Sequence, residues 1–129
     1  MSRILGVAIL VMGIGSGTAM ADMNVSLYQQ LRGAQDSETK AVLKLFIEGT
    51  YTALLTTSLR YDSDGYPMAF CPPGSEYLAV DDLYGLIDKE IVTAKGTRPQ
   101  PYTGTEPIAL ILLNGLQTVY PCESYKRTP

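Results

Sequence analysis

The chain has 129 residues, with ten basic and 13 acidic side chains, a formal net charge of −3, nine tyrosines, two cysteines and no histidine. The lack of histidine excludes Ser-His-Asp and Cys-His catalytic arrangements and imidazole metal sites. The sequence has no run of basic residues, so we expect no binding to nucleic acid or to an anionic membrane surface.

The first 21 residues have the three-part layout of a secretory signal peptide. Arg3 supplies the positive start, residues 4–14 are apolar or glycine without interruption, and Ala19-Met20-Ala21 is a small-x-small cleavage pattern. An apolar run of 11 residues is too short to span a bilayer, which needs roughly 20. We therefore expect a Sec-type signal cleaved after Ala21, export without membrane insertion, and one domain over residues 22–129.

The remaining chain predicts a small all-α domain, a bundle of about four helices. We expect a first helix over 25–32 and a second from an N-cap at Asp36 or Ser37 to about Ser58. Three- and four-residue steps predict that the second helix turns these residues inward: Ala41, Val42, Leu45, Phe46, Gly49 and Ala53. An adjoining apolar face indicates burial on more than one side: Leu43, Ile47 and Leu54.

Residues 61–76 are predicted to be irregular, because Asp62-Ser63-Asp64-Gly65 has turn chemistry and prolines follow it. A third helix is expected over 80–94, with an inward stripe made by Val80, Leu83, Tyr84, Ile87, Ile91 and Ala94. After a proline-containing loop over 97–104, Thr105 is the expected cap of a last helix over 106–120. That helix is apolar almost all round, which predicts that it lies in the core. A short apolar run could also form a strand, but the capped start and the length of this segment favour a helix.

The two cysteines have similar proline-flanked settings, Phe70-Cys71-Pro72-Pro73 and Tyr120-Pro121-Cys122. In an oxidising compartment a single pair with no competing thiol forms a disulfide. Such a bridge closes a loop of about 50 residues, which the chain-entropy model values at roughly 4 kcal/mol. A bridged thiol cannot act as a nucleophile.

Other patterns that could support chemistry are incomplete. Asp62-x-Asp64-Gly65 resembles the middle of a calcium loop, but Arg60 and Cys71 then stand where carboxylates are essential. Four carboxylates lie mostly off the apolar face of the predicted third helix, as solvated side chains do: Asp81, Asp82, Asp88 and Glu90. We therefore expect no catalytic residue, no metal and no cofactor.

Two connections remain as candidate recognition loops, over 61–69 and 97–104. Short, proline-stiffened loops that carry tyrosine and arginine lose little entropy on binding. The plain alternative is that they are solvent-exposed connectors. The recognition interpretation predicts that six side chains bind a partner: Asp62, Asp64, Tyr66, Arg98, Gln100 and Tyr102.

Four features occur together between residues 41 and 122. They are Phe46-x-x-Gly49, the Phe70-Cys71-Pro72-Pro73 motif, a helix of about fifteen residues with a proline-bearing loop, and Leu112-x-x-x-Leu116-x-x-x-Tyr120-Pro121-Cys122. This combination resembles the Tai/Rap type of immunity protein, which comprises small periplasmic helical proteins that neutralise cell-wall amidase toxins delivered by type VI secretion. The resemblance implies a periplasmic location, the Cys71–Cys122 bridge and no enzymatic activity.

Three hypotheses for function follow. The leading one is an immunity-type protein that occludes the active-site cleft of a cognate amidase toxin, as a monomer or a homodimer. The second is an acid-stress chaperone, which would expose apolar surface when its carboxylates become protonated at about pH 4. The third is an envelope domain with a structural role or an unknown ligand.

Overall fold

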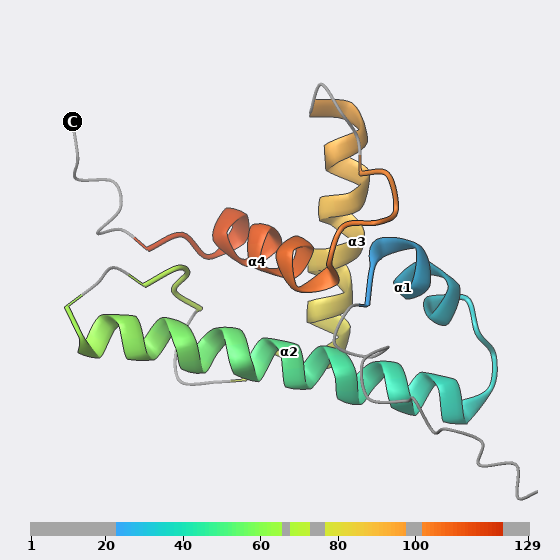
Figure 1. Ribbon diagram of the computed structural model, residues 1–129, viewed down its shortest axis with the longest axis horizontal. Helices are drawn as coiled ribbons and strands as arrows, with labels where there is room; N and C mark the ends of the chain where they lie inside the picture. The colour runs from blue at the N-terminus through green and yellow to red at the C-terminus, as the bar shows by residue number, and fades with distance from the viewer. Residues whose placement is uncertain (1–22, 66–67, 73–76, 98–101, 123–129) are drawn as a thin grey trace, which may run out of the picture.

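The computed structural model describes residues 23–65, 68–72, 77–97 and 102–122. Within these residues the chain is all-α, as predicted, with one disulfide and four helices: α1 (Val25–Arg32), α2 (Ser37–Ser63), α3 (Val80–Thr97) and α4 (Ile108–Val119). Figure 1 shows that α2 runs the length of the molecule, α4 lies alongside it, and α3 extends across the direction of both. The expected signal sequence over 1–21 lies outside the described residues. None of the described helices combines the length and apolar character needed to cross a membrane.

Side-chain caps set the starts of the first two helices. The side-chain oxygen of Asn24 accepts a hydrogen bond from the backbone N–H of Leu27 at 2.8 Å, which caps α1. At the start of α2, the carboxylate of Asp36 accepts from the backbone N–H of Thr39 at 3.2 Å. The predicted range 25–32 is therefore confirmed, and so is Asp36 as the cap of the second helix.

Helix α2 continues to Ser63 rather than ending at about Ser58, so residues 61–63 are helical and not irregular. The turn chemistry that we assigned to the loop instead ends the helix: Asp64 is its C-cap, and Gly65 follows with a left-handed φ of +81°. Three threonines inside α2 bond back to their own helix: the hydroxyls of Thr50, Thr52 and Thr57 each donate to a carbonyl oxygen one turn earlier. The helix tolerates them in this way.

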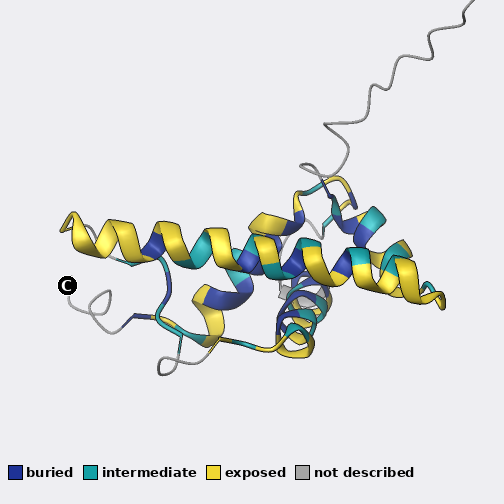
Figure 2. Ribbon diagram, turned by 90° about the horizontal axis from the view of Figure 1, so that it is seen from below, coloured by how far each residue is buried: buried dark blue, intermediate teal, exposed yellow. Residues whose placement is uncertain are grey.

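The inward face of α2 is not the face predicted first. Leu43, Ile47 and Tyr51 are buried, whereas the side chain of Leu45 is 70% exposed. Of the other residues expected to face inward, three are exposed, namely Ala41, Gly49 and Ala53. The remaining two, Val42 and Phe46, are half-buried. Figure 2 shows the buried residues of α2 as short patches between exposed stretches. The apolar residues of α2 lie on several of its sides. Their spacing alone therefore does not identify the side that packs against α1, α3 and α4.

The predicted inner stripe of α3 is confirmed, whereas α4, expected to be the core helix, is buried on one side and leaves Leu110 46% exposed on the other. Along α3 the expected stripe is buried at Leu83, Ile87, Ile91 and Ala94, and half-buried at Val80 and Tyr84. Helix α4 contributes four fully buried side chains to the core: Ile108, Ile111, Leu112 and Leu116. The two helices approach closely at Gly115, where an added Cβ would lie 3.2 Å from the carbonyl oxygen of Leu86.

The start of α4 differs from the prediction. The helix begins at Ile108, its N-cap is Pro107, and Thr105 does not cap it. No side chain caps the start of α4. Instead, the backbone N–H of Ile108 donates to the carbonyl oxygen of Met23, in the chain before α1, at 2.8 Å. The first helical N–H is therefore satisfied by a distant segment, which local sequence cannot reveal.

The residues just before α4 form a tight turn against α1. The carboxylate of Glu106 accepts hydrogen bonds from the backbone N–H groups of Thr103 at 2.7 Å and Gly104 at 3.0 Å. These bonds, with that from Thr103 foremost, hold the pKa of Glu106 below its ordinary value. Gly104 has a left-handed φ of +103°, its carbonyl accepts from the Ser26 N–H at 3.0 Å, and a Cβ there would collide with the Ser26 hydroxyl.

Candidate binding surface

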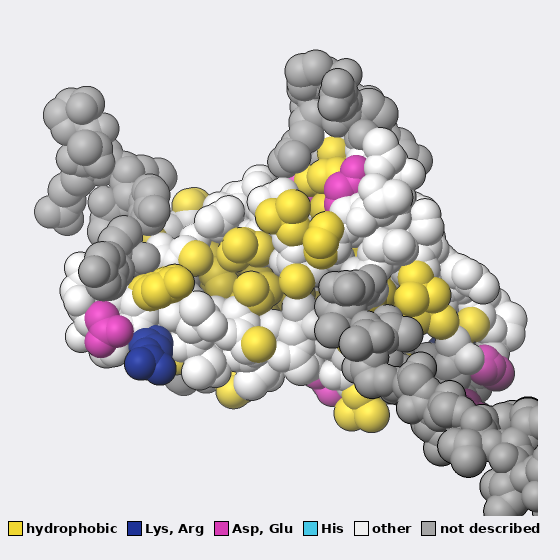
Figure 3. Space-filling model, viewed as in Figure 1, with side chains coloured by type: hydrophobic (Ala, Val, Ile, Leu, Met, Phe, Trp, Pro, Cys, Tyr) yellow, Lys and Arg dark blue, Asp and Glu magenta, His cyan; other side chains and the backbone are white. Residues whose placement is uncertain are grey.

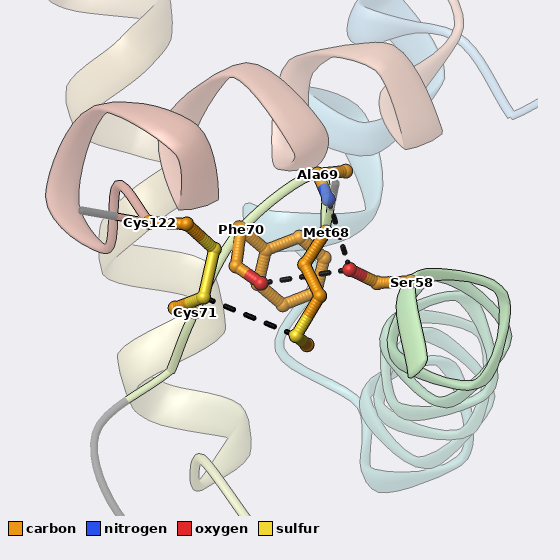
Figure 4. Close-up of a disulfide and its surroundings, with 6 residues drawn as sticks. All are labelled: Ser58, Met68, Ala69, Phe70, Cys71 and Cys122. Atoms are coloured by element: carbon orange, nitrogen blue, oxygen red, sulfur yellow. Dashed lines mark hydrogen bonds between the residues drawn. A yellow bond between two sulfur atoms is a disulfide. The ribbon is translucent and has the colours of Figure 1, made fainter. Parts of the chain in front are cut away.

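The Cys71–Cys122 disulfide joins the segment 68–72 to the chain just after α4 (Figure 4). The two Cα atoms are 5.0 Å apart. Beside the bridge, the backbone N–H of Cys71 donates to the carbonyl oxygen of Tyr120 at 2.8 Å. The predicted pairing is confirmed, and it adds a covalent link to a segment that is also held by the fully buried side chain of Phe70.

A buried hydroxyl of α2 holds the same segment from the opposite side. Ser58 is 1% exposed; its Oγ accepts from the backbone N–H of Ala69 at 3.0 Å and lies 3.5 Å from the carbonyl oxygen of Phe70, to which it donates (Figure 4). Sequence reasoning missed Ser58. It follows Ile47 and Tyr51 at helical spacing on the buried face, a signal lost when only apolar residues are counted.

An open apolar groove of about 430 Å³ lies between α2 and α4, next to this segment. Its apolar lining comes from Leu54 and Tyr61 of α2, from Ala69, and from Ala109 and Leu113 of α4. Figure 3 shows apolar side chains gathered over the α2–α4 region of this face of the molecule. Because α4 is apolar almost all round, the residues that it turns away from the core become the wall of the groove.

The serine and threonine hydroxyl groups of the groove lining are used as donors inside the fold. Thr50 Oγ1 donates to the carbonyl oxygen of Phe46 at 2.8 Å, and Thr57 Oγ1 donates to that of Ala53 at 2.9 Å. Ser58 is engaged with the segment 68–72, as described above. The groove therefore presents chiefly methyl and methylene groups, which suit an apolar side chain better than a polar small molecule.

Two of the predicted partner-binding residues lie near one end of this groove. Asp62 is exposed and follows Tyr61, which lines the groove. Asp64 is also exposed, and its Oδ2 lies 3.9 Å from Nε of Arg60. An exposed pair at that distance neutralises little charge. The groove thus has an apolar interior, and the charged residues Arg60, Asp62 and Asp64 all lie within three positions of Tyr61 in the chain.

A third predicted partner-binding residue, Tyr102, does not line this groove. The Tyr102 hydroxyl donates to Glu90 Oε1 at 2.9 Å and accepts from Asn114 Nδ2 at 3.3 Å, which ties the chain before α4 to α3 and α4. In Figure 1 the segment that begins at residue 102 lies at the opposite end of α4 from the C-terminal end of α2. The remaining three fall outside the described residues: Tyr66, Arg98 and Gln100.

A second polar cluster joins α1 to α3. The Tyr28 hydroxyl donates to Asp88 Oδ1 at 2.8 Å, and Arg32 Nη2 lies 2.9 Å from Asp88 Oδ2. The Arg32 guanidinium also stacks over the ring of Tyr84, 4.3 Å from its centroid. Burial, aided by the bond to Asp88, raises the pKa of Tyr28 well above its ordinary value. A phenol held protonated in this way fastens two helices and is unsuited to act as a base.

Within the described part of the chain, no three or more cysteine, aspartate or glutamate side chains gather as a metal site would require. Comparison of the chain with protein-family models, with curated proteins and with solved structures found no match. The α2–α4 groove, with the exposed Asp62 and Asp64 following Tyr61 in the chain, is a candidate binding site.

Proposed function

We propose that this protein is a periplasmic immunity-type binding protein that blocks a peptidoglycan amidase toxin by stoichiometric binding. It performs no reaction itself; it covers the active-site cleft and keeps substrate out. The class of partner is supported by the resemblance of the two cysteine motifs to the Tai/Rap type of immunity protein. The mode of binding is supported by the geometry of the α2–α4 groove.

The observation that carries the proposal is the apolar groove itself. A contiguous apolar surface left open to water is typical of a site for another protein. The Ala69 wall is fixed by the disulfide on one side and by Ser58 on the other. A wall held in this way loses little conformational entropy when a partner's side chain enters, so more of the contact energy appears as affinity.

The charges near the groove specify the partner further. Asp62 and Asp64 are exposed beside Tyr61, and the whole chain has a formal net charge of −3. Opposite charge on the partner speeds association and selects the orientation of the complex. The segment of the amidase that binds here therefore places an apolar side chain in the groove and carries a lysine or arginine close to it in sequence.

The test is to mix the purified, oxidised protein with an amidase toxin sought among the genes that neighbour its own. Gel filtration should show a stable complex, and peptidoglycan hydrolysis should fall until a fixed molar ratio is reached. A muramidase, which cleaves the sugar backbone of the same substrate, is the control and should keep its activity. The proposal fails if no complex forms and amidase activity stays undiminished at excess protein.

A further inference from the structure

A second pocket, of about 290 Å³, lies where α1, α2 and α3 meet beside the N-terminal half of α2. Leu31, Leu43 and Val80 give it an apolar lining, and the ring of Tyr84 adds an aromatic one. Its volume suits a small organic group rather than a helix or a strand. The α2–α4 groove has different lining residues, so the two sites are separate.

Most of the described basic side chains line this pocket. The structure describes five lysine and arginine side chains, and three of them line it: Arg32, Lys40 and Lys44. This is unexpected in a chain with a net charge of −3. Lys40 and Lys44 stand one turn apart on α2, a spacing at which like charges destabilise a helix. An anion bound between them would remove that repulsion.

The guanidinium of Arg32 is already held in place for such a ligand. Asp88 Oδ2 lies 2.9 Å from its Nη2, and the ring of Tyr84 packs against its face. A guanidinium has five N–H donors, and the bond to Asp88 uses one of them. Arg32 can therefore bind a second carboxylate without losing its first.

Carboxylates also surround the pocket, and each of its three cations has one as a partner or neighbour. Asp81 lines the pocket, and Glu48 Oε1 lies 3.9 Å from Lys44 Nζ. The charge of Lys40 acts on Asp36, one turn earlier, but within the described residues Lys40 makes no ion-pair contact. The Lys40 ammonium is therefore the group that a ligand would meet first.

We propose that this pocket binds a carboxylate carried on a short apolar stem. The carboxylate lies among Arg32, Lys40 and Lys44, and the stem rests on the side chains of Leu43 and Tyr84. Such a group is found in a free organic acid and in an acidic residue of a protein, and the test separates the two. The site is independent of the proposed function and stands whether or not an amidase binds the groove.

The first experiment is an NMR titration of the isotopically labelled protein with 3-phenylpropionate. Its control is 3-phenylpropanol, which has the same stem and no charge. We expect saturable shifts of the backbone amides of residues 31–32, 40–44 and 80–84 with the acid alone, weakened by added salt. Absence of saturable shifts, or equal binding of the alcohol, would overturn the proposal.

The second experiment uses the double variant Lys40→Gln/Lys44→Gln, with Lys89→Gln as its control. All three lysines are exposed, and Lys89 lies on α3 outside this pocket, so the fold should be kept in both proteins. Binding should weaken by about tenfold in the double variant, which loses two exposed charge pairs, and stay unchanged in the control. Wild-type affinity in the double variant would overturn the proposal.

The source of the carboxylate is decided with a capped tripeptide that has glutamate between two leucines. Its control has glutamine in place of the glutamate. Binding of the glutamate peptide at least as tight as that of 3-phenylpropionate, with no binding of the glutamine peptide, assigns the site to an acidic residue of a protein. Binding of 3-phenylpropionate alone assigns it to a free acid.

Discussion

The backbone N–H of Cys71 donates to the carbonyl oxygen of Tyr120 at 2.8 Å, next to the covalent bond between Cys71 and Cys122. The chain after α4 thus holds the segment 68–72 by a disulfide and by a backbone hydrogen bond. Ala69 of that segment lines the α2–α4 groove and is bonded to Ser58 of α2. The same contacts therefore support both the stability of the fold and the shape of the candidate binding surface.

Removal of the bridge should cost much of the stability. The cysteines are 51 residues apart, and closing a loop of that size is worth about 4 kcal/mol in the chain-entropy model. We expect the variant Cys71→Ser/Cys122→Ser to lose about 2–5 kcal/mol of unfolding free energy in urea denaturation. Wild-type protein treated with a reductant is the control and should lose as much. An unchanged urea midpoint in both would show that the bridge does not stabilise the fold.

Helix α4 should tolerate truncation on its outer side and not on its inner side. Leu112 is fully buried, whereas Leu110 on the same helix is 46% exposed. Leu112→Ala should lower the unfolding free energy by about 2–5 kcal/mol through lost burial and a new cavity. Leu110→Ala should cost about 0.5 kcal/mol, the range of surface substitutions. Equal costs for the two, measured by urea unfolding, would contradict the assigned inner face.

Loss of the Ser58 hydroxyl should loosen the segment 68–72. In Ser58→Ala the backbone N–H of Ala69 loses its acceptor in a partly buried place, which costs about 1 kcal/mol, the low end of the range for a donor left unpaired. Thr57→Ala is the matched control, because its hydroxyl only bonds back to its own helix. Hydrogen exchange should show faster exchange of the Ala69 amide in Ser58→Ala and no change in Thr57→Ala. Equal protection of that amide in all three proteins would rule out the role assigned to Ser58.

Alkaline pH should weaken the fold through its tyrosines. Burial raises the pKa of Tyr28, and the bond to Asp88 raises it further; burial also raises the pKa values of Tyr51 and Tyr84. The unfolded chain then releases these protons at about pH 10, before the folded chain does. Their contribution to stability is therefore complete below that pH and falls as the pH rises above it.

This is checked by following tyrosinate absorbance during an alkaline titration of the folded and the urea-unfolded protein. The folded protein should ionise fewer tyrosines in the step at about pH 10. In Tyr28→Phe, one group should disappear from the late step. If every tyrosine of the folded protein ionises together in the first step, the burial assigned to these phenols is wrong.

Sequence alone predicted the parts of the fold that depend on neighbouring residues. The Asp36 cap, the limits of α1 and the cysteine pair each follow from short local patterns or from composition. The inner face of α2 did not, because apolar residues lie on several sides of that helix. Its choice of Leu43 and Ile47 depends on packing against helices that are distant in sequence.

The candidate site was predicted only in part, for a related reason. Asp62 and Asp64 were identified from turn composition, and they follow Tyr61, a lining residue of the groove, within three positions; Asp62 is in a helix. The α4 wall, with Ala109 and Leu113, was missed because an all-round apolar pattern was interpreted as burial on every side. Within the described residues, α4 packs against α2 and α3, which leaves part of its apolar surface open.

The central claim is that a partner amidase docks in the α2–α4 groove. Ala53 and Ala41 are both exposed on α2, and of the two only Ala53 lines the groove. Calorimetric titration of the amidase should show binding of the wild type and of Ala41→Arg with equal affinity. Ala53→Arg, which fills the groove, should bind at least about thirtyfold more weakly. Wild-type affinity in Ala53→Arg would contradict the claim.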